Sequence, residues 1–166
     1  GIQIDASTRA FVLNDDPDRK YHEQFLDRFG SDTTLAIGFE YEGTVFRPDV
    51  LRRLLTVSHR IEALRDVKDV LGITTVFYPT AEGRLSNLEE LLRAGPVTPD
   101  ALAGFEREMR ANRIVGENLL TADGQTTVLF LHFADGSDDE AIVDHGTLDD
   151  IRAILRDEIG DTAKFM

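Results

Sequence analysis

The sequence predicts an α+β fold, a two-layer sandwich in which helices pack on one face of an antiparallel sheet. The first observation is a strand–helix–strand pattern over residues 29–79, with turn residues at each junction. The second is an apolar strand at 127–133 that is followed by an amphipathic helix at 148–159. Between these halves, the stretch of about 85–113 shows short helical patterns with few β-forming residues, so we expect a helical insertion there.

Residues 1–30 form an N-terminal segment that we expect to pack on a domain of residues 31–166, which makes the chain a single structural domain. A turn at 14–17 starts a short helix that Gly30 ends, and its apolar face carries Tyr21, Phe25 and Phe29. The apolar residues before the turn could pair as an edge strand or lie along the core: Ile2, Ile4, Phe11, Val12 and Leu13.

The strand predicted at 35–42 alternates large apolar residues with small or acidic ones. Glu40 and Glu42 share one face, which we interpret as the side of a half-buried sheet that meets water rather than as an acid–base pair. Pro48 suits the first position of a helix. Residues 70–78 are rich in Val, Ile, Thr and aromatics and predict a second strand. The buried strand face comprises Leu35, Ile37, Phe39 and Tyr41, and the helix stripe comprises Leu51, Leu54, Leu55, Ser58, Ile61 and Leu64.

Cap signals mark the helices of the insertion. Ser86 and Glu89 have the spacing of a capping box, which predicts that Ser86 caps the first helix. Thr98 and Pro99 begin the second helix in the same manner. The apolar residues that we expect to point inward from it are Leu102, Phe105 and Met109.

A hairpin is predicted over residues 118–133, because Asp123 and Gly124 between apolar runs favour a tight turn. Its return strand is apolar on both faces, as an interior strand would be. Thr147 resembles the cap of a last helix, and 164–165 resembles the start of a last strand. Without the insertion and the extra hairpin arm, the order is βαββαβ, a ferredoxin-like split β-α-β sandwich. The last helix stripe comprises Leu148, Ile151, Ile154, Leu155 and Ile159.

Charge and composition exclude several classes of function. The 166 residues include 18 basic and 31 acidic ones, a net charge of −13, and no long basic run, which argues against nucleic-acid binding because that requires clustered Lys and Arg to neutralise phosphates. No stretch approaches the ~18 consecutive apolar residues of a membrane helix, and no signal-peptide pattern is present. The sequence begins abruptly at Gly1 and ends on a strand-like segment, and we expect both ends to be cuts within a longer protein.

No motif predicts catalysis. The four histidines, at positions 22, 59, 132 and 145, are far apart, and His132 is interpreted as a hydrogen-bonded residue of the interior strand. The acidic loop at 135–140 resembles a calcium loop but lacks its Gly at loop position six, and Gly146 stands where the bidentate Glu is needed. Phosphate-loop, dinucleotide and nucleophile-elbow motifs are absent. We therefore expect no catalytic residue, no cofactor and no metal ligand.

The order and spacing of several motifs resemble the extracytoplasmic porter-type domain of resistance-nodulation-division (RND) superfamily exporters, in particular the MMPL-like branch that includes lipid transporters. The match covers nearly the whole chain. The motifs that carry it are residues 11–17 (FVLNDDP), the aromatic helix after them, the strand at 35–42, the helix start at 48–51 (PDVL), residues 61–70 (IEALRDVKDV), residues 118–127 (NLLTADGQTT) and the apolar strand that follows.

This resemblance implies both a location and a role. In such exporters the domain lies on the periplasmic side of the bacterial inner membrane, between the first and second membrane helices. The family exports hydrophobic or amphiphilic compounds, including lipids, by using the proton-motive force. The implied partners are the rest of the transporter chain, the transported substrate and further copies in a homo-oligomer. The resemblance implies no covalent chemistry, and the family's proton-relay residues belong to membrane helices outside this chain.

Two other functions stay open. One is a stand-alone ferredoxin-like domain that binds a small ligand, dimerises through its sheet and acts in regulation. The other is a small hydrolase of acylphosphatase-like fold, which would need an anion-binding loop with an Arg after the first strand. At that place this chain has the acidic sequence YEGTV, residues 41–45, which ranks the hydrolase last.

Overall fold

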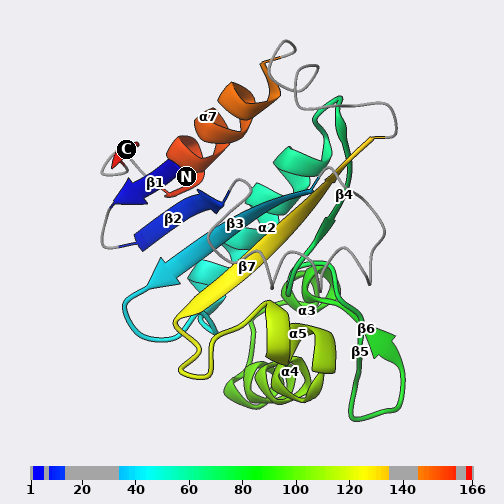
Figure 1. The fold of residues 1–166 in the computed structure, drawn as a ribbon. Coiled ribbons are helices and arrows are strands. Elements are labelled where there is room, and N and C mark those ends of the chain that lie inside the picture. Colours follow the sequence, from blue (N-terminus) through cyan, green and yellow to red (C-terminus); the bar gives the residue numbers. More distant parts are fainter. Residues whose placement is uncertain (1, 6–7, 14–33, 135–145, 160–163, 166) are drawn as a thin grey trace.

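The computed structural model of the protein is an α+β structure built on an antiparallel sheet (Figure 1). It describes residues 2–5, 8–13, 34–134, 146–159 and 164–165. The strands of the main sheet are β1 (Ile2–Asp5), β2 (Thr8–Leu13), β3 (Thr34–Tyr41), β4 (Val67–Leu71), β7 (Thr126–Phe133) and β8 (Lys164–Phe165). Among the described residues, these six strands lie in the order β4-β7-β3-β2-β1-β8, and every neighbouring pair is antiparallel.

The N-terminal strands lie inside the sheet. β1 and β2 pair with each other, β2 pairs with β3 from Thr8↔Tyr41 to Leu13↔Ala36, and β1 pairs with β8. Of the two arrangements left open by the sequence, pairing is therefore the observed one, but β8 rather than β1 forms the edge. The helix predicted at 17–29 lies outside the described residues.

β3 and the helix after it confirm the predicted pattern. Leu35, Ile37, Phe39 and Tyr41 are all buried, whereas Glu40 is exposed. Helix α2 (Pro48–Glu62) has Pro48 at its first turn, as predicted. The predicted stripe residues Leu55 and Leu64 are only partly buried. The buried residues of α2 are Val50, Leu51, Leu54, Val57, Ser58 and Ile61.

β7 has an antiparallel neighbour on each side. It pairs with β3 on one side and with β4 on the other, so β7 is an interior strand, as its apolar character predicted. Helix α7 (Thr147–Ile159) lies beside α2, because Arg60 donates hydrogen bonds to Asp157 at 3.1 Å and Glu158 at 3.0 Å. The α+β class is thus the one expected.

The strand predicted at 70–78 is wrong in its extent. β4 ends at Leu71, and the chain turns at Gly72, whose carbonyl accepts hydrogen bonds from the amides of Thr75 and Val76. The Thr75 hydroxyl also bonds the Gly72 amide at 3.1 Å and the Gly72 carbonyl at 3.2 Å, so a side chain competes with the sheet for this backbone. A Cβ at Gly72 would lie 2.2 Å from Leu129 Cδ2, which favours glycine at this bend.

The segment after this turn forms a separate hairpin. β5 (Tyr78–Pro79) pairs with β6 (Leu85–Ser86) in the register Tyr78↔Ser86 and Pro79↔Leu85. The predicted insertion is present as α3 (Leu88–Arg93) and α4 (Pro99–Ala111). A further helix, α5 (Arg113–Asn118), extends it beyond residue 113. Figure 1 shows this hairpin and these helices gathered at the end of the sheet where β7 begins.

Three predicted local features need correction. Asn87, not Ser86, caps α3, since its Oδ1 accepts the Glu90 amide at 2.9 Å, while the Ser86 hydroxyl donates to the Glu90 carboxylate instead. The hairpin arm before Asp123-Gly124 shrinks to one bridge, Leu120↔Thr127, because α5 occupies the chain up to Asn118. Thr147 starts α7, but its hydroxyl donates to Asp66 Oδ2 at 2.6 Å rather than capping the helix.

Candidate ligand pocket

Among the described residues, the histidines and acids considered in the sequence do not meet in one place. His132 is 8% exposed, and its Nδ1 lies 2.5 Å from Asp69 Oδ1 on β4, where the β4–β7 register shifts. It is therefore the hydrogen-bonded sheet residue that was expected. His59 Nε2 lies 3.4 Å from Glu89 Oε2 on the surface. Glu40 is exposed on β3, as expected for the solvent-facing side of the sheet. The strand predicted at 35–42 is one residue too long, because β3 ends at Tyr41, so Glu42 is exposed in the turn after the strand and does not share its face with Glu40.

The remaining candidates fall on other parts of the chain. His22, His145 and the acidic loop at 135–140 lie outside the described residues. Within the described ranges, no three His, Asp or Glu side chains come together as metal ligands. No described helix combines the length and apolar character that a membrane crossing requires.

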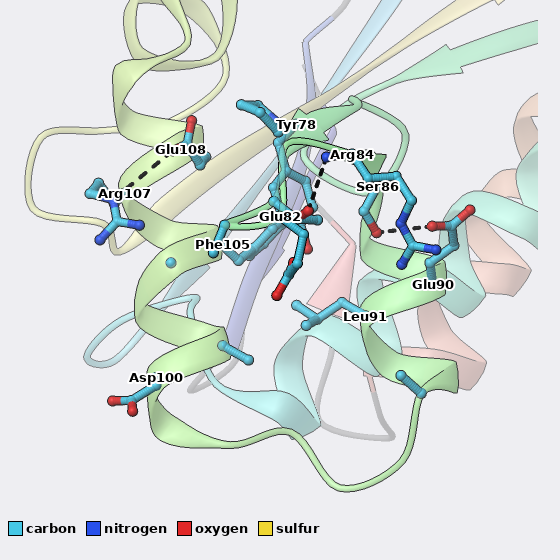
Figure 2. Close-up of a pocket in the computed structure, with 16 residues that line it drawn as sticks. Tyr78, Glu82, Arg84, Ser86, Glu90, Leu91, Asp100, Phe105, Arg107 and Glu108 are labelled. Atoms are coloured by element: carbon cyan, nitrogen blue, oxygen red, sulfur yellow. Dashed lines mark hydrogen bonds and ion pairs between the residues drawn. The ribbon is translucent and has the colours of Figure 1, made fainter.

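A pocket of about 400 Å³ lies within the insertion, and neither His132, Asp69 nor Glu40 lines it (Figure 2). The β5–β6 hairpin, α3 and α4 form its walls. The helices that shape it begin at side-chain caps: Asn87 for α3, and Thr98, whose hydroxyl accepts the Ala101 amide at 3.1 Å, for α4. Caps of this kind fix where each helix starts and hence where its side chains point.

Aromatic rings form the apolar wall of the pocket. Phe105 is fully buried, and its ring meets the ring of Tyr78 edge-on at a centroid distance of 5.2 Å. Phe105 also meets Phe46 edge-on at a centroid distance of 5.9 Å, and the Arg110 guanidinium lies 5.7 Å from the centre of the Phe46 ring. Edge-to-face pairs of this kind hold their rings in fixed orientations. The wall is therefore continuous with the hydrophobic core of the domain.

Tyr78 connects this wall to a polar network. Burial raises the pKa of the Tyr78 phenol, and a hydrogen bond with Ser86 opposes that rise. Ser86 is 5% exposed and stands opposite Tyr78 in the hairpin, and its hydroxyl donates to Glu90 Oε2 at 3.0 Å. A buried hydroxyl thus positions one carboxylate at the side of the pocket.

Charged side chains surround the pocket opening, and acids outnumber bases. The acids are Glu82, Glu90, Asp100 and Glu108, and the bases are Arg84 and Arg107. Arg107 Nε lies 4.0 Å from Glu108 Oε1. Glu82 and Asp100 make no ion pair with any other described residue. The geometry is that of a binding site with an apolar base and an acidic mouth.

Sequence reasoning placed Phe105 and Met109 inward correctly but did not find the pocket. Both residues are fully buried. The pocket was missed because Tyr78 was assigned to a continuous strand at 70–78, which would have left no hairpin above α4. The signal that could have found it is Gly83, which has a φ of 79° in the turn between β5 and β6. A residue that favours positive φ between short apolar segments predicts a hairpin.

No protein-family model matches the chain, and no curated protein is significantly similar to it.

Proposed function

We propose that this chain is the extracytoplasmic porter-type domain of an RND-type exporter of the MMPL-like branch, and that its pocket forms part of the path for hydrophobic or lipid-like substrates. The motif order described in the sequence supports the family. The pocket based on Tyr78 and Phe105 supports the role, and it is the observation on which the proposal rests. The proposed location is the periplasmic side of the inner membrane, with the rest of the transporter chain as partner.

The proposed architecture is ferredoxin-like. α2 connects β3 to β4, and β7 lies between these two strands, which is the arrangement of a split β-α-β unit. In this proposal β7, α7 and β8 supply the second unit, and the β1–β2 pair is an addition between β3 and β8. The pocket then belongs to an insertion in the connection between β4 and β7.

Size and polarity agree with a small amphiphile as ligand. Small-ligand pockets measure about 300–1,000 Å³ and are mostly apolar, with a few polar groups that fix orientation. This pocket has about 400 Å³, an aromatic base and polar groups at its mouth. Each methylene that leaves water for such a wall contributes about 0.8 kcal/mol, so a short alkyl chain supplies measurable affinity. No bond-breaking step is part of this function.

Gly104 allows a direct test, because it lines the pocket and a Cβ there would come only to 3.8 Å of Arg107 Nη2. Gly104→Leu should fill the pocket, and it replaces a poor helix former with a good one, which favours α4 by about 0.8–1 kcal/mol. We expect decyl maltoside, below its micelle concentration, to shift amide resonances of the pocket in the native chain and not in Gly104→Leu. Ala103→Leu is the matched control, since Ala103 is exposed on α4 and does not line the pocket.

Equal binding by both leucine variants would contradict the assignment of this pocket. The exporter itself is tested by the reading frame that encodes the chain, which should continue into hydrophobic spans of about 20 residues on both sides. A frame that ends near Met166 would contradict the family proposal.

A further inference from the structure

The charges around the pocket indicate which class of ligand it binds. This inference rests on the function proposed above. We propose that the pocket selects a positively charged amphiphile, an alkyl ammonium whose head is held by the carboxylates of Glu90 and Glu82 and whose tail lies against Leu91 and Ala101. Ser86 acts as a positioning residue for Glu90. All five residues line the pocket.

Glu90 is the acid with the best-defined position. Its Oε2 accepts the hydrogen bond from Ser86 at 3.0 Å, and its backbone amide donates to Asn87 Oδ1 at 2.9 Å at the start of α3. Ser86 itself is only 5% exposed, so the protein shields its hydroxyl from solvent. A carboxylate fixed in this way retains Oε1 for a ligand and loses little side-chain freedom on binding.

Glu82 adds a second negative charge from the hairpin wall of the pocket. Figure 2 shows Glu82 reaching over the pocket from the hairpin and Glu90 standing on α3 at its side. Glu82 makes no ion pair with another described residue. An ammonium group between these acids would be attracted by both.

The basic residues do not reverse this preference. Arg107 lies 4.0 Å from Glu108, and Figure 2 shows that pair on the α4 side of the pocket. Arg84 is the other base, and it shares the opening with Glu82, Glu90 and Asp100. An anionic head would therefore meet more repulsion than attraction, and a neutral head would gain nothing from the charges.

The test compares ligands that share one tail. Decyltrimethylammonium, decyl maltoside and decyl sulfate are titrated into the chain below their micelle concentrations, and binding is measured by calorimetry and amide chemical shifts. We expect decyltrimethylammonium to bind most tightly and its affinity to fall as NaCl rises from about 20 to 300 mM, because salt screens exposed charges. Gly104→Leu should abolish the binding of all three.

Variants assign the selectivity to named residues. Glu90→Gln should weaken ammonium binding about three- to five-fold, as loss of an exposed ion pair does, and leave decyl maltoside binding unchanged. Ser86→Ala should lower the ratio of ammonium to maltoside affinity, and Ser86→Thr should restore it, which a purely structural role of Ser86 would not produce. Glu89→Gln is the charge-matched control, because Glu89 lies next to Glu90 on α3 but outside the pocket.

The outcomes separate this inference from the function on which it rests. If the maltoside or the sulfate binds as tightly as the ammonium, and Gly104→Leu still abolishes binding, the selectivity is refuted while the pocket assignment stands. Equal effects of Glu90→Gln and Glu89→Gln also refute it. If none of the three amphiphiles binds in a manner sensitive to Gly104→Leu, the proposed function and this inference are both overturned.

Discussion

The hydroxyl of Thr147 donates a hydrogen bond to the Asp66 carboxylate at 2.6 Å, and both residues are buried, at 3% and 5% exposure. Asp66 directly precedes β4 and Thr147 begins α7, so one polar contact joins segments 81 residues apart. The Asp66 carbonyl also accepts the Ala134 amide at 2.7 Å, next to the end of β7. These contacts fix the start of α7 against the sheet.

Removal of this hydroxyl should destabilise the fold. Thr147→Val keeps the side-chain shape but leaves the buried carboxylate without this donor, and we expect a loss of about 1–3 kcal/mol in the free energy of unfolding. Urea denaturation followed by circular dichroism measures it. Asp149→Asn, which touches only the exposed pair with Arg152, is the control and should change stability by less than about 0.5 kcal/mol. Equal effects of the two variants would show that the Asp66 contact is unimportant.

The buried face of α2 should not accept a charge. Leu54 is 1% exposed, and Leu54→Asp would place a carboxylate in the core at a cost of several kcal/mol, comparable to the ~5–15 kcal/mol that holds a domain together. We expect no cooperative thermal transition in this variant. Thr56→Asp, at an exposed position of the same helix, should melt close to the native chain. Melting of Leu54→Asp within a few degrees of the native chain would refute the assigned face.

Gly124 adopts a left-handed backbone conformation and leaves space for the Arg110 side chain, and its replacement should disturb both features. Its φ of 70° favours glycine, and an added Cβ would lie 2.6 Å from Arg110 Nη2. Gly124→Ala must displace a guanidinium that donates to the Ala122 carbonyl at 2.9 Å and lies over Phe46. Gly83→Ala, at a φ of 79° with no atom within 4 Å of the added Cβ, isolates the cost of the backbone alone.

We expect each alanine to lose about 1–2 kcal/mol of stability through its left-handed conformation, and Gly124→Ala to lose about 1 kcal/mol more through the displaced hydrogen bond. Chemical denaturation of both variants measures the difference. In an Arg110→Ala background the excess should disappear, because the contact no longer exists. An excess that persists there would point to a different cause.

High pH should destabilise the protein through Tyr41. Burial raises the pKa of Tyr41 to about 12, against the opposing charges of Arg53 and Arg47. Between pH 10 and 12 the folded state then holds a proton that the unfolded state has released, so the free energy of unfolding falls as pH rises through this window. Below pH 10 this contribution is fully present.

Stability curves from pH 8 to 12, with absorbance at 295 nm to follow tyrosinate, check this expectation. Tyr41→Phe should make the decline shallower. It should not remove it, because burial also raises the pKa of Tyr78. An identical decline in native chain and variant would refute the role of Tyr41.

The parts of the fold that the sequence predicted are those governed by local rules. Alternation in Leu35, Ile37 and Phe39 predicts the buried face of β3, and Pro48 predicts the start of α2, because neither depends on distant residues. Gly124 predicts the tight turn before β7 for the same reason.

The sequence predictions that proved wrong or incomplete concern features that depend on contacts which no local pattern reveals. Thr75 turns the chain at Gly72 and ends β4 within a run of β-forming residues. Thr147 bonds Asp66, which is distant in sequence, instead of its own helix. The pocket needs the hairpin at Tyr78 to fold over α4, so its residues could be predicted as apolar or acidic but not as neighbours.

The insertion has a topological consequence. The chain leaves the sheet at the end of β4 and returns as β7, and these strands are direct neighbours. Deletion of the whole insertion would leave a simple connection between the adjacent strands β4 and β7 and would not change the strand order of the sheet. Lineages could therefore lengthen, shorten or exchange this module independently of the scaffold, and protein engineers could graft another there. The Phe46–Phe105 contact limits that freedom, since a replacement module must bring its own side chain to cover Phe46.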